Sequence, residues 1–307
     1  MANSMPDLKR PPVCDYEGSD YQTRFWDKGG REYEDRCEAI ALKRLLPKKG
    51  KLLLELGAGA GRNTLRYTGF ERVVLLDYSR TQLKQAQELL GNSEHFIYVA
   101  ADIYRLPFID GLFDAATMIR VLHHMADAQA ALRQVRNVMQ PGACFILEFA
   151  NKRNLKSILR YTLHLQTWNP FTPDSVEFAP LNFDFQPRTL FEWLKNLGFQ
   201  IEKILPVSHF RINLLKRTIP PALLAGLDSI LQGTGSLGQF SPSVFLRARV
   251  LGENNVSEEH KELASYFKCL ECGHSPLVIT DQHILCPACK HTWNISGGIF
   301  DFRGDDL

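Results

Sequence analysis

The fold of this chain is decided at residues 52–61, which read LLLELGAGAG. The first half is an apolar run that suits a buried strand, and the second half is a glycine turn. Glycines let a backbone bend sharply and approach a ligand without a Cβ in the way. Asp77, twenty residues after Gly57, ends a second apolar run, where a carboxylate can accept hydrogen bonds from both ribose hydroxyls. The stretch therefore predicts a nucleotide site at the end of a buried strand.

Strands and helices alternate through residues 51–150. A helical pattern precedes this region and stops at Pro47, and further strands are predicted at 73–76, 96–100, 113–119 and 144–149. Helices are predicted to begin near Arg62, after Ser79 and at Asp127. Short apolar strands joined by crossover helices predict an α/β fold, with a parallel sheet covered by helices on both faces. Ligands of such sheets bind at the carboxyl ends of the strands, so functional residues are expected there.

Three details separate this turn from a dinucleotide site. The glycines are spaced G-x-G-x-G, and Arg62 stands where a dinucleotide turn has its third glycine. Glu55 precedes the turn, where an acid suits a cationic ligand better than a pyrophosphate. Asp102 ends the third predicted strand and can accept a hydrogen bond from an adenine amino group. These features favour S-adenosylmethionine, which carries a positive charge and no pyrophosphate. The alternative is a glycine turn that only packs a helix on a strand.

Residues 40–150 resemble the class I S-adenosylmethionine-dependent methyltransferases of the ubiquinone/menaquinone-methyltransferase type. The resemblance rests on residues 54–61, 74–79, 101–102, 106–108 and 113–124. It implies a Rossmann-like, seven-stranded sheet whose last two strands lie at 201–207 and 244–250. It also implies a set of cofactor contacts, namely Glu55, Gly57 and Gly59 on the methionine part, Asp77 on the ribose, Asp102 and Ile103 on the adenine, Arg120 beside methionine or substrate, and Gly61 and Tyr78 elsewhere on the cofactor.

The acceptor of the methyl group is less constrained. Residues 119–124 read IRVLHH, without the Asn/Asp-Pro-Pro-aromatic motif of many base- and amide-nitrogen methyltransferases. A small-molecule acceptor methylated on O, C or N is therefore favoured. His123, His124 and Glu148 are the candidate catalytic residues, since they follow strands at the expected transfer site and can carry a proton. A purely structural role is the alternative for each of them.

Residues 16–33 and 151–217 are expected to cover the substrate. Residues 151–217 hold ten Lys/Arg against five Asp/Glu, whereas residues 218–307 hold six against ten. The aromatic side chains expected to line an apolar pocket are Phe25, Trp26, Trp168, Phe171, Phe178 and Phe183. The basic side chains expected to hold an anionic group are Lys152, Arg153, Lys156 and Arg160. Ordinary aromatic packing and a solvated basic face are the alternatives.

The C-terminal region carries a metal-binding pattern. Cys269 and Cys272 form one C-x-x-C pair, and Cys286 and Cys289 form another thirteen residues later. Two such pairs offer four thiolates to one ion, which predicts a structural, tetrahedral zinc site joined by a hairpin near residues 277–285. A redox pair is the alternative. Residues 266–303 also resemble the small zinc-ribbon activator proteins that bind methyltransferases, which implies that the ribbon contacts the rest of the chain.

The 307 residues allow one large domain and one small one. The expected division is a methyltransferase domain at 1–250, a linker at 251–265 and a zinc ribbon at 266–307. Within the first domain, 1–50 form a cap, 51–150 the nucleotide-binding core, and 151–250 the substrate-covering insertions and last strands. No apolar run is long enough for a membrane span, and residues 1–12 do not read as a secretory signal, so a cytoplasmic protein is expected.

Three functions remain open from the sequence. The first is a small-molecule methyltransferase with an attached ribbon. The second is an RNA or ribosome-associated methyltransferase whose basic insertion or ribbon holds nucleic acid, which is possible but not favoured because the positive charge is local. The third is a cofactor-binding scaffold that regulates a partner.

Overall fold

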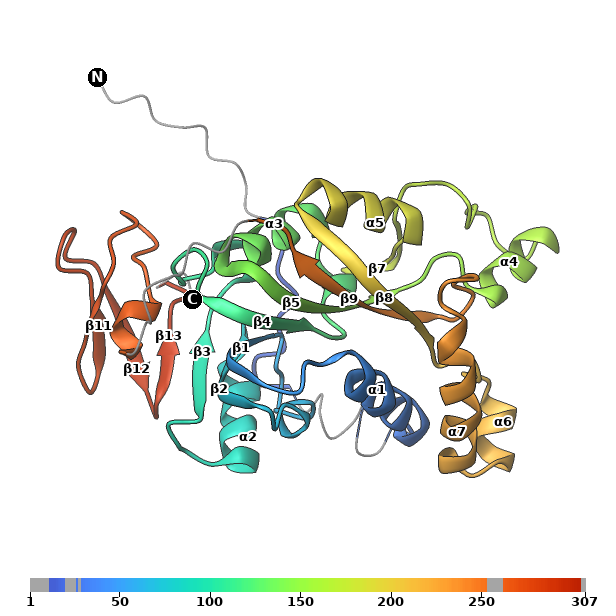
Figure 1. Cartoon of the computed structure of the whole chain (residues 1–307), viewed down its shortest axis with the longest axis horizontal. Helices are drawn as coiled ribbons and strands as arrows, with labels where there is room; N and C mark the ends of the chain where they lie inside the picture. The colour runs from blue at the N-terminus through green and yellow to red at the C-terminus, as the bar shows by residue number, and fades with distance from the viewer. Residues whose placement is uncertain (1–10, 20–25, 27–28, 253–261, 305–307) are drawn as a thin grey trace, which may run out of the picture.

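The central sheet is larger than the sequence predicts (Figure 1). In the computed structural model, which describes residues 11–19, 26, 29–252 and 262–304, eleven strands pair in the order β10-β11-β12-β13-β3-β2-β1-β4-β5-β9-β8. The seven expected strands form its second part. They are β1 (Gly50–Leu56), β2 (Phe70–Asp77), β3 (Phe96–Ala100), β4 (Phe113–Met118), β5 (Met139–Ala150), β8 (Phe199–Val207) and β9 (Ser243–Val250). The first five run parallel, whereas β9 and β8 are antiparallel additions.

Helices cover both faces of this sheet, as predicted. On one face the core includes side chains of α1 (Glu32–Leu45), α2 (Arg80–Leu90) and α7 (Pro221–Leu231). On the other face it includes those of α3 (Ala128–Val138) and α5 (Pro187–Asn196). The helix starts follow the sequence, because Ser79 and Asp127 each accept a hydrogen bond from a backbone N–H of the first turn. Of the described helices, none is long and apolar enough to cross a membrane.

The helix predicted to begin near Arg62 is absent, and that prediction was wrong. Only a 3₁₀ turn, Thr64–Arg66, lies between β1 and β2. The second strand begins at Phe70, three residues before its apolar core, so residues 57–69 are the whole connection. A crossover between parallel strands takes a dozen or more residues, and the glycine turn uses the first five of these. The shortened loop leaves Arg62 and Arg66 facing α1, where both pair with Asp35.

The C-terminal strands extend the same sheet. They are β10 (Val278–Ile279), β11 (His283–Leu285), β12 (Thr292–Ser296) and β13 (Ile299–Asp301). The three pairings within the ribbon are antiparallel, but β13 pairs in parallel with β3, with Phe300 opposite Val99. Phe267 is fully buried and stacks on Phe108 with ring centroids 5.6 Å apart. The ribbon is thereby joined to the main domain through both backbone and core.

The opposite end of the molecule is built from the insertions (Figure 1). It contains α4 (Leu155–Thr162), the hairpin of β6 (Val176–Ala179) and β7 (Asn182–Asp184), α6 (Asn213–Thr218) and α7. The segment anchoring α4 is buried, since Asn151 donates its side-chain amide to the carbonyls of Gln239 and Ser241. This end faces the carboxyl side of β4 and β5, where a ligand is expected.

Candidate functional site

The glycine turn after β1 wraps one side of a cavity at the carboxyl edge of the sheet. Gly57 has φ +65°, and a Cβ there would lie 2.2 Å from a methyl carbon of Val121, so only glycine fits. Gly59 has φ +55° and donates its backbone N–H to Asp77 at 2.8 Å. Gly61 does not line the cavity, because it packs against Ala86 and Leu90 of α2. Two of the three glycines therefore shape the ligand site, and the third docks a helix.

Two carboxylates face this cavity, those of the buried Glu55 and the half-buried Asp77. Glu55 accepts hydrogen bonds from the hydroxyls of Thr64, at 2.5 Å, and Tyr67, at 3.2 Å. Burial nevertheless raises the pKa of Glu55 to about 7. Asp77 accepts backbone N–H groups of Gly59 and Ser79, and burial raises its pKa to about 6. A positively charged or hydroxyl-rich ligand in the cavity would stabilise the ionised form of each carboxyl.

The far wall of the cavity supplies the remaining predicted contacts. Asp102, Ile103 and Tyr78 all line it. Asp102 also caps the short turn after β3 by accepting the backbone N–H of Tyr104 at 2.8 Å. Gln82, which the sequence reasoning missed, is buried at the same cavity with its carbonyl oxygen unpartnered among the described residues. The lining fits S-adenosylmethionine, because Glu55 suits its amino group, Asp77 its ribose and Asp102 its adenine.

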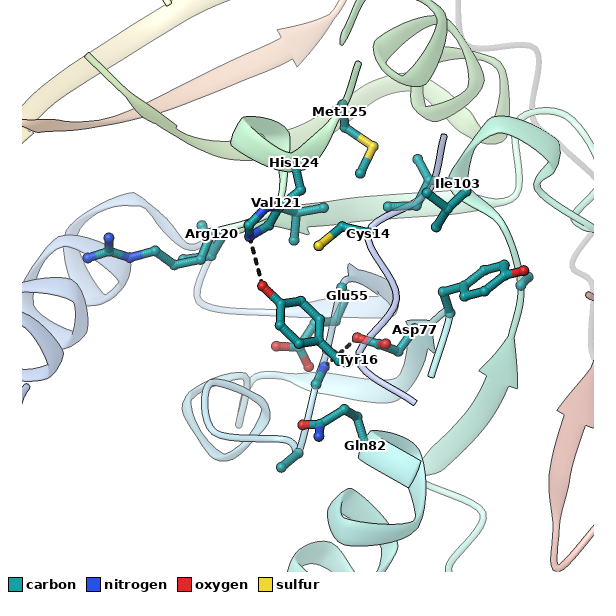
Figure 2. Close-up of a pocket in the computed structure, with 18 of the residues that line it drawn as sticks. Cys14, Tyr16, Glu55, Asp77, Gln82, Ile103, Arg120, Val121, His124 and Met125 are labelled. Atoms are coloured by element: carbon teal, nitrogen blue, oxygen red, sulfur yellow. Dashed lines mark hydrogen bonds between the residues drawn. The ribbon is translucent and has the colours of Figure 1, made fainter. Parts of the chain in front are cut away.

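The N-terminal segment crosses this cavity (Figure 2). Tyr16 lies among Glu55, Asp77 and His124, and its hydroxyl is 3.2 Å from Nε2 of His124. Glu17 continues the contact by accepting the backbone N–H groups of Arg80 and Thr81 at the start of α2. Residues 16–19 therefore cover the cofactor side of the site, whereas the sequence assigned residues 16–33 to the substrate.

Arg120 is held away from the cavity centre by α1 (Figure 2). It has φ +63°, its guanidinium donates to Glu38 at 2.7 Å, and its backbone N–H donates to Glu148 at 3.0 Å. Glu38 is fully buried and also pairs with Arg62 at 2.7 Å. Burial raises the pKa of Glu38, but the two arginines outweigh it and hold that pKa at about 2. Arg62 in turn stacks on Trp26, 3.5 Å from the ring centroid. This ion network fixes the backbone at the junction of two cavities.

A second cavity of about 750 Å³ opens beside the first, and Arg120 lines both. Its polar lining includes His123, Asp184 and Arg211, which are half-buried, and Glu148, which is buried. Its upper walls are apolar and come from α4 and the loops that follow it, including Leu159, Leu163 and Trp168. Cavities of this size suit a small organic molecule. The sequence contained the pieces of this cavity but no local signal that Asp184 and Arg211 would meet Glu148.

The three candidate catalytic residues occupy different positions. His124 has both ring nitrogens engaged, since Nδ1 lies 2.9 Å from the carbonyl of Leu181 and Nε2 contacts Tyr16. Glu148 accepts hydrogen bonds from Arg120 and from the hydroxyl of Ser243. His123 lines the second cavity, and its Nδ1 has no hydrogen-bond partner among the described residues. Burial, then His124 and Arg120, hold the pKa of His123 well below the ordinary value, which keeps its imidazole neutral.

The predicted aromatic and cationic cover is only partly at the second cavity. Trp168, Phe178, Lys156 and Arg160 line it. Three of the other aromatic side chains pack elsewhere: Trp26 lies under Arg62, Phe171 contacts Tyr161, and Phe183 packs on the core. Lys152 is buried against Thr172 and Asp174, and Arg153 lies over Phe171 and Phe240. Phe25 is outside the described residues.

The four ribbon cysteines come together as predicted. The Sγ atoms of Cys269, Cys272, Cys286 and Cys289 lie within 4.8 Å of one another. The Sγ atoms of Cys269 and Cys289 are 3.5 Å apart, and those of Cys272 and Cys286 are 3.6 Å apart. Both distances are close to the sulfur–sulfur separation of a tetrahedral site with metal–sulfur bonds of about 2.3 Å. Backbone N–H groups within each pair point at Sγ of Cys269 and Cys286. The cluster is compatible with zinc.

The end of the ribbon reaches the cofactor cavity. Arg303, buried beside Asp301 at 2.9 Å, donates to the backbone carbonyl of Tyr78 at 3.1 Å and pairs with Glu17 at 3.3 Å. Its guanidinium also lies 5.5 Å from the ring of Tyr78. Asp301 pairs with Arg80 at 3.4 Å. The ribbon therefore supports both the wall of the cofactor cavity and the segment that covers it.

A family model described as a methyltransferase domain matches residues 54–147, which include the glycine turn, Asp77, Asp102 and His124. Residues 54–147 are a methyltransferase domain. Curated relatives of the methyltransferase domain include an O-methyltransferase of Penicillium expansum, 33% identical, with the match covering 44% of this chain and 52% of the relative. A demethylmenaquinone methyltransferase of Corynebacterium kroppenstedtii is 30% identical, with 49% and 65% covered. The chain spans about half the length of these relatives.

Solved structures extend the similarity of fold beyond the methyltransferase domain. One is described as an S-adenosylmethionine-dependent methyltransferase from Listeria monocytogenes, with a TM-score of 0.53, 18% identity, and 72% of this chain and 99% of that chain covered. Another comes from a complex between the Haloferax volcanii Trm112 methyltransferase activator and a methyltransferase, with a TM-score of 0.52, 16% identity, and 76% and 98% covered. Both show the fold, with its seven-stranded sheet.

Proposed function

We propose that this chain is an S-adenosylmethionine-dependent methyltransferase that acts on a small molecule bound in the 750 Å³ cavity beside the cofactor site. The observation that carries the proposal is the junction of two cavities at Arg120. One is lined by the carboxylates of Glu55, Asp77 and Asp102, and the other has a polar floor and apolar walls. Two adjoining ligand sites are what a group transfer between two small molecules requires.

The chemistry requires little beyond positioning and exclusion of water. Bound S-adenosylmethionine would supply an electrophilic methyl group, whose bond to the sulfonium sulfur breaks as the acceptor's nucleophilic atom attacks the carbon in line, leaving a neutral thioether. Glu55 and Asp77 would hold the cofactor's amino group and ribose. Glu148 and Glu38 hold the backbone and side chain of Arg120, which sets the position of the junction. Tyr16 covers the cofactor side and limits the entry of water.

An acceptor with a hydroxyl or amine proton also needs a base, and His123 is the side chain we propose. The ring of His123 is neutral and lines the second cavity, so it would take the proton as the new bond to the methyl carbon forms. His124 is a positioning residue, because its ring holds Tyr16 and the loop at Leu181. A carbon acceptor that is already an anion would not need this step.

We further propose that zinc holds the ribbon in the form that docks on β3. The forty-residue ribbon has little core of its own apart from Phe267, Trp293 and Phe302, so four metal–thiolate bonds would supply much of its folding free energy. The RNA alternative has less support, because the basic side chains at the second cavity, Lys156 and Arg160, border a mostly apolar lining of a size that suits a small molecule.

The test is cofactor binding and methyl transfer by the purified chain. Isothermal titration calorimetry is expected to show one S-adenosylmethionine site, lost in Asp77→Ala and retained in Glu94→Ala, a matched change of an exposed loop carboxylate. Labelled methyl groups are expected in the small-metabolite fraction of a cell extract. Label only in RNA, or wild-type affinity in Asp77→Ala, would refute the proposal.

A further inference from the structure

Exposed apolar side chains gather at the end of the molecule that lies opposite the ribbon. Of seventeen large apolar side chains exposed in the described structure, thirteen lie between residues 155 and 240. They are Leu155, Leu159, Leu163, Leu165, Phe171, Phe178, Ile212, Leu214, Leu223, Leu227, Ile230, Leu237 and Phe240. Figure 1 shows that α4, α6 and α7, which contribute many of them, occupy that same end. We call this set, with its helices, the apolar end. A patch of this extent indicates an interaction surface.

Helix α4 shows the pattern most clearly. Leu155, Leu159 and Leu163 stand at i, i+4 and i+8, so they follow one face of the helix and its C-cap. Leu155 is 56% exposed and Leu163 is 65% exposed, whereas the buried residue of this helix is Ser157. Lys156 and Arg160 each come one residue after a leucine of the stripe and border it, and both are exposed. The helix is amphipathic, and its exposed apolar face lies along the second cavity, whose lining includes all three leucines.

Helices α6 and α7 extend the surface. In α7, Leu224 and Ala225 pack inward, and Leu223, Leu227 and Ile230 form a second outward stripe, with Ile230 74% exposed. No residue of α6 is buried. Ile212, just before α6, lines the second cavity together with Leu155 and Leu159 of α4. The mouth of the acceptor cavity is therefore part of the apolar end.

The three helices of this surface are positively charged, whereas the segment that carries Phe171 and Phe178 adds the exposed carboxylates of Asp174 and Glu177. Helices α4, α6 and α7 contain Lys156, Arg160, Lys216 and Arg217, and their one carboxylate, Asp228, is fully buried. Lys216 pairs with Glu34, which leaves Lys156, Arg160 and Arg217 toward the outside. Outward leucines bordered by lysine and arginine are typical of helices that lie in the interface of an anionic lipid bilayer.

We propose that the apolar end docks on an anionic lipid surface, with the mouth of the acceptor cavity turned toward the lipid. The outward stripe of α7 would enter the headgroup–acyl boundary, the leucines of α4 would face the lipid from the mouth of the cavity, and the basic side chains would contact lipid phosphates. A symmetric dimer through this face is disfavoured because it would bring the basic side chains of two copies together. The docking itself requires neither cofactor nor acceptor, so it can be tested independently of the proposed function.

Vesicle sedimentation with the full chain tests this surface. At low salt the chain is expected to sediment with vesicles of phosphatidylcholine containing about one third phosphatidylglycerol, with a partition coefficient about tenfold above that for phosphatidylcholine alone. Added salt should reduce the difference, because it screens the charges. Ile230→Glu with Leu223→Glu is expected to lower the partition coefficient about tenfold, and neither residue lines a cavity described above.

Leu89→Glu is the matched control, since Leu89 is 54% exposed on α2, away from the apolar end. It is expected to bind vesicles like the wild type. Absence of binding to anionic vesicles, or equal loss in Leu89→Glu and in the α7 variant, would overturn the proposal. A dimer in light scattering that Ile230→Glu dissociates would overturn it too, since a second copy would then cover this face. Calorimetric binding of S-adenosylmethionine by the α7 variant separates a failure of docking from a failure of the proposed function.

Discussion

Glu55 makes cofactor binding depend on pH in a way that can be calculated. In the free chain, burial raises the pKa of this carboxyl to about 7, although Thr64 and Tyr67 donate hydrogen bonds to it. A cationic cofactor beside it favours the ionised form and lowers its pKa toward the ordinary value of about 4.3. Binding of S-adenosylmethionine must therefore release a proton from Glu55 below pH 7, and affinity must fall as pH falls through 7.

The size of the effect follows from the fraction ionised. With a free pKa of about 7, Glu55 is roughly nine-tenths ionised at pH 8 and roughly one-tenth ionised at pH 6, so affinity falls about ninefold, or about 1.3 kcal/mol. Asp77, whose pKa burial raises to about 6, adds a further factor of about two over the same range. The two together predict a dissociation constant that is roughly twentyfold larger at pH 6 than at pH 8.

Isothermal titration calorimetry at pH 6, 7 and 8, in buffers of different ionisation enthalpy, measures both affinity and proton release. The variant Glu55→Gln removes the carboxyl but retains a hydrogen-bond acceptor for Thr64. Its affinity is expected to be lower at pH 8, and the ratio of the variant's dissociation constant to that of the wild type should fall about ninefold from pH 8 to pH 6. The cofactor's own titration cancels in this ratio. A ratio that is constant with pH would refute the assignment of Glu55 to the cofactor's cation.

Three further predictions concern the ribbon and the transfer site. The purified chain is expected to contain one zinc ion by elemental analysis. Cys286→Ser should lower the zinc content, and it should lower the melting temperature measured by calorimetry by about 5–10 °C. An unchanged melting temperature after removal of the metal would contradict this prediction. Phe267→Ala removes a fully buried ring between Phe108, Phe300 and Phe302, so it should lower the free energy of unfolding in urea by about 3–5 kcal/mol. The control Phe178→Ala, at an exposed ring, should lower it by under about 0.5 kcal/mol. With an acceptor that carries a proton, His123→Gln should lower the rate of methyl transfer about a hundredfold or more with unchanged cofactor affinity, and an equal loss of cofactor affinity would point to a structural role.

Several features were decided by local sequence. The strand at residues 52–56, the glycine turn and Asp77 lie within one strand–turn–strand unit, so periodicity and spacing were enough to place them. The same holds for the four cysteines, because each C-x-x-C pair forms its own turn and a short hairpin joins the pairs. Where the local pattern was ambiguous it misled, since the residues after Gly61 form a 3₁₀ turn in place of a helix.

Other features depend on contacts between distant parts of the chain. Tyr16 reaches His124 across 108 positions, and Arg303 reaches Tyr78 across 225. Nothing near Tyr16 or Arg303 in the sequence encodes those partners. The acceptor cavity likewise needs β5, α4 and the loop before α6 to be packed together before Glu148 and Arg211 share a floor.

The sequence by itself determined the sheet, the carboxylates for the cofactor and the cysteines for the metal, because short-range backbone geometry encodes each of them. Only the tertiary structure decided that β13 joins the edge of the sheet at β3, that the N-terminal segment covers the first cavity, and that His123 but not His124 lines the second cavity. Those outcomes depend on which apolar faces and buried charges find one another on folding, and that is a property of the packed chain.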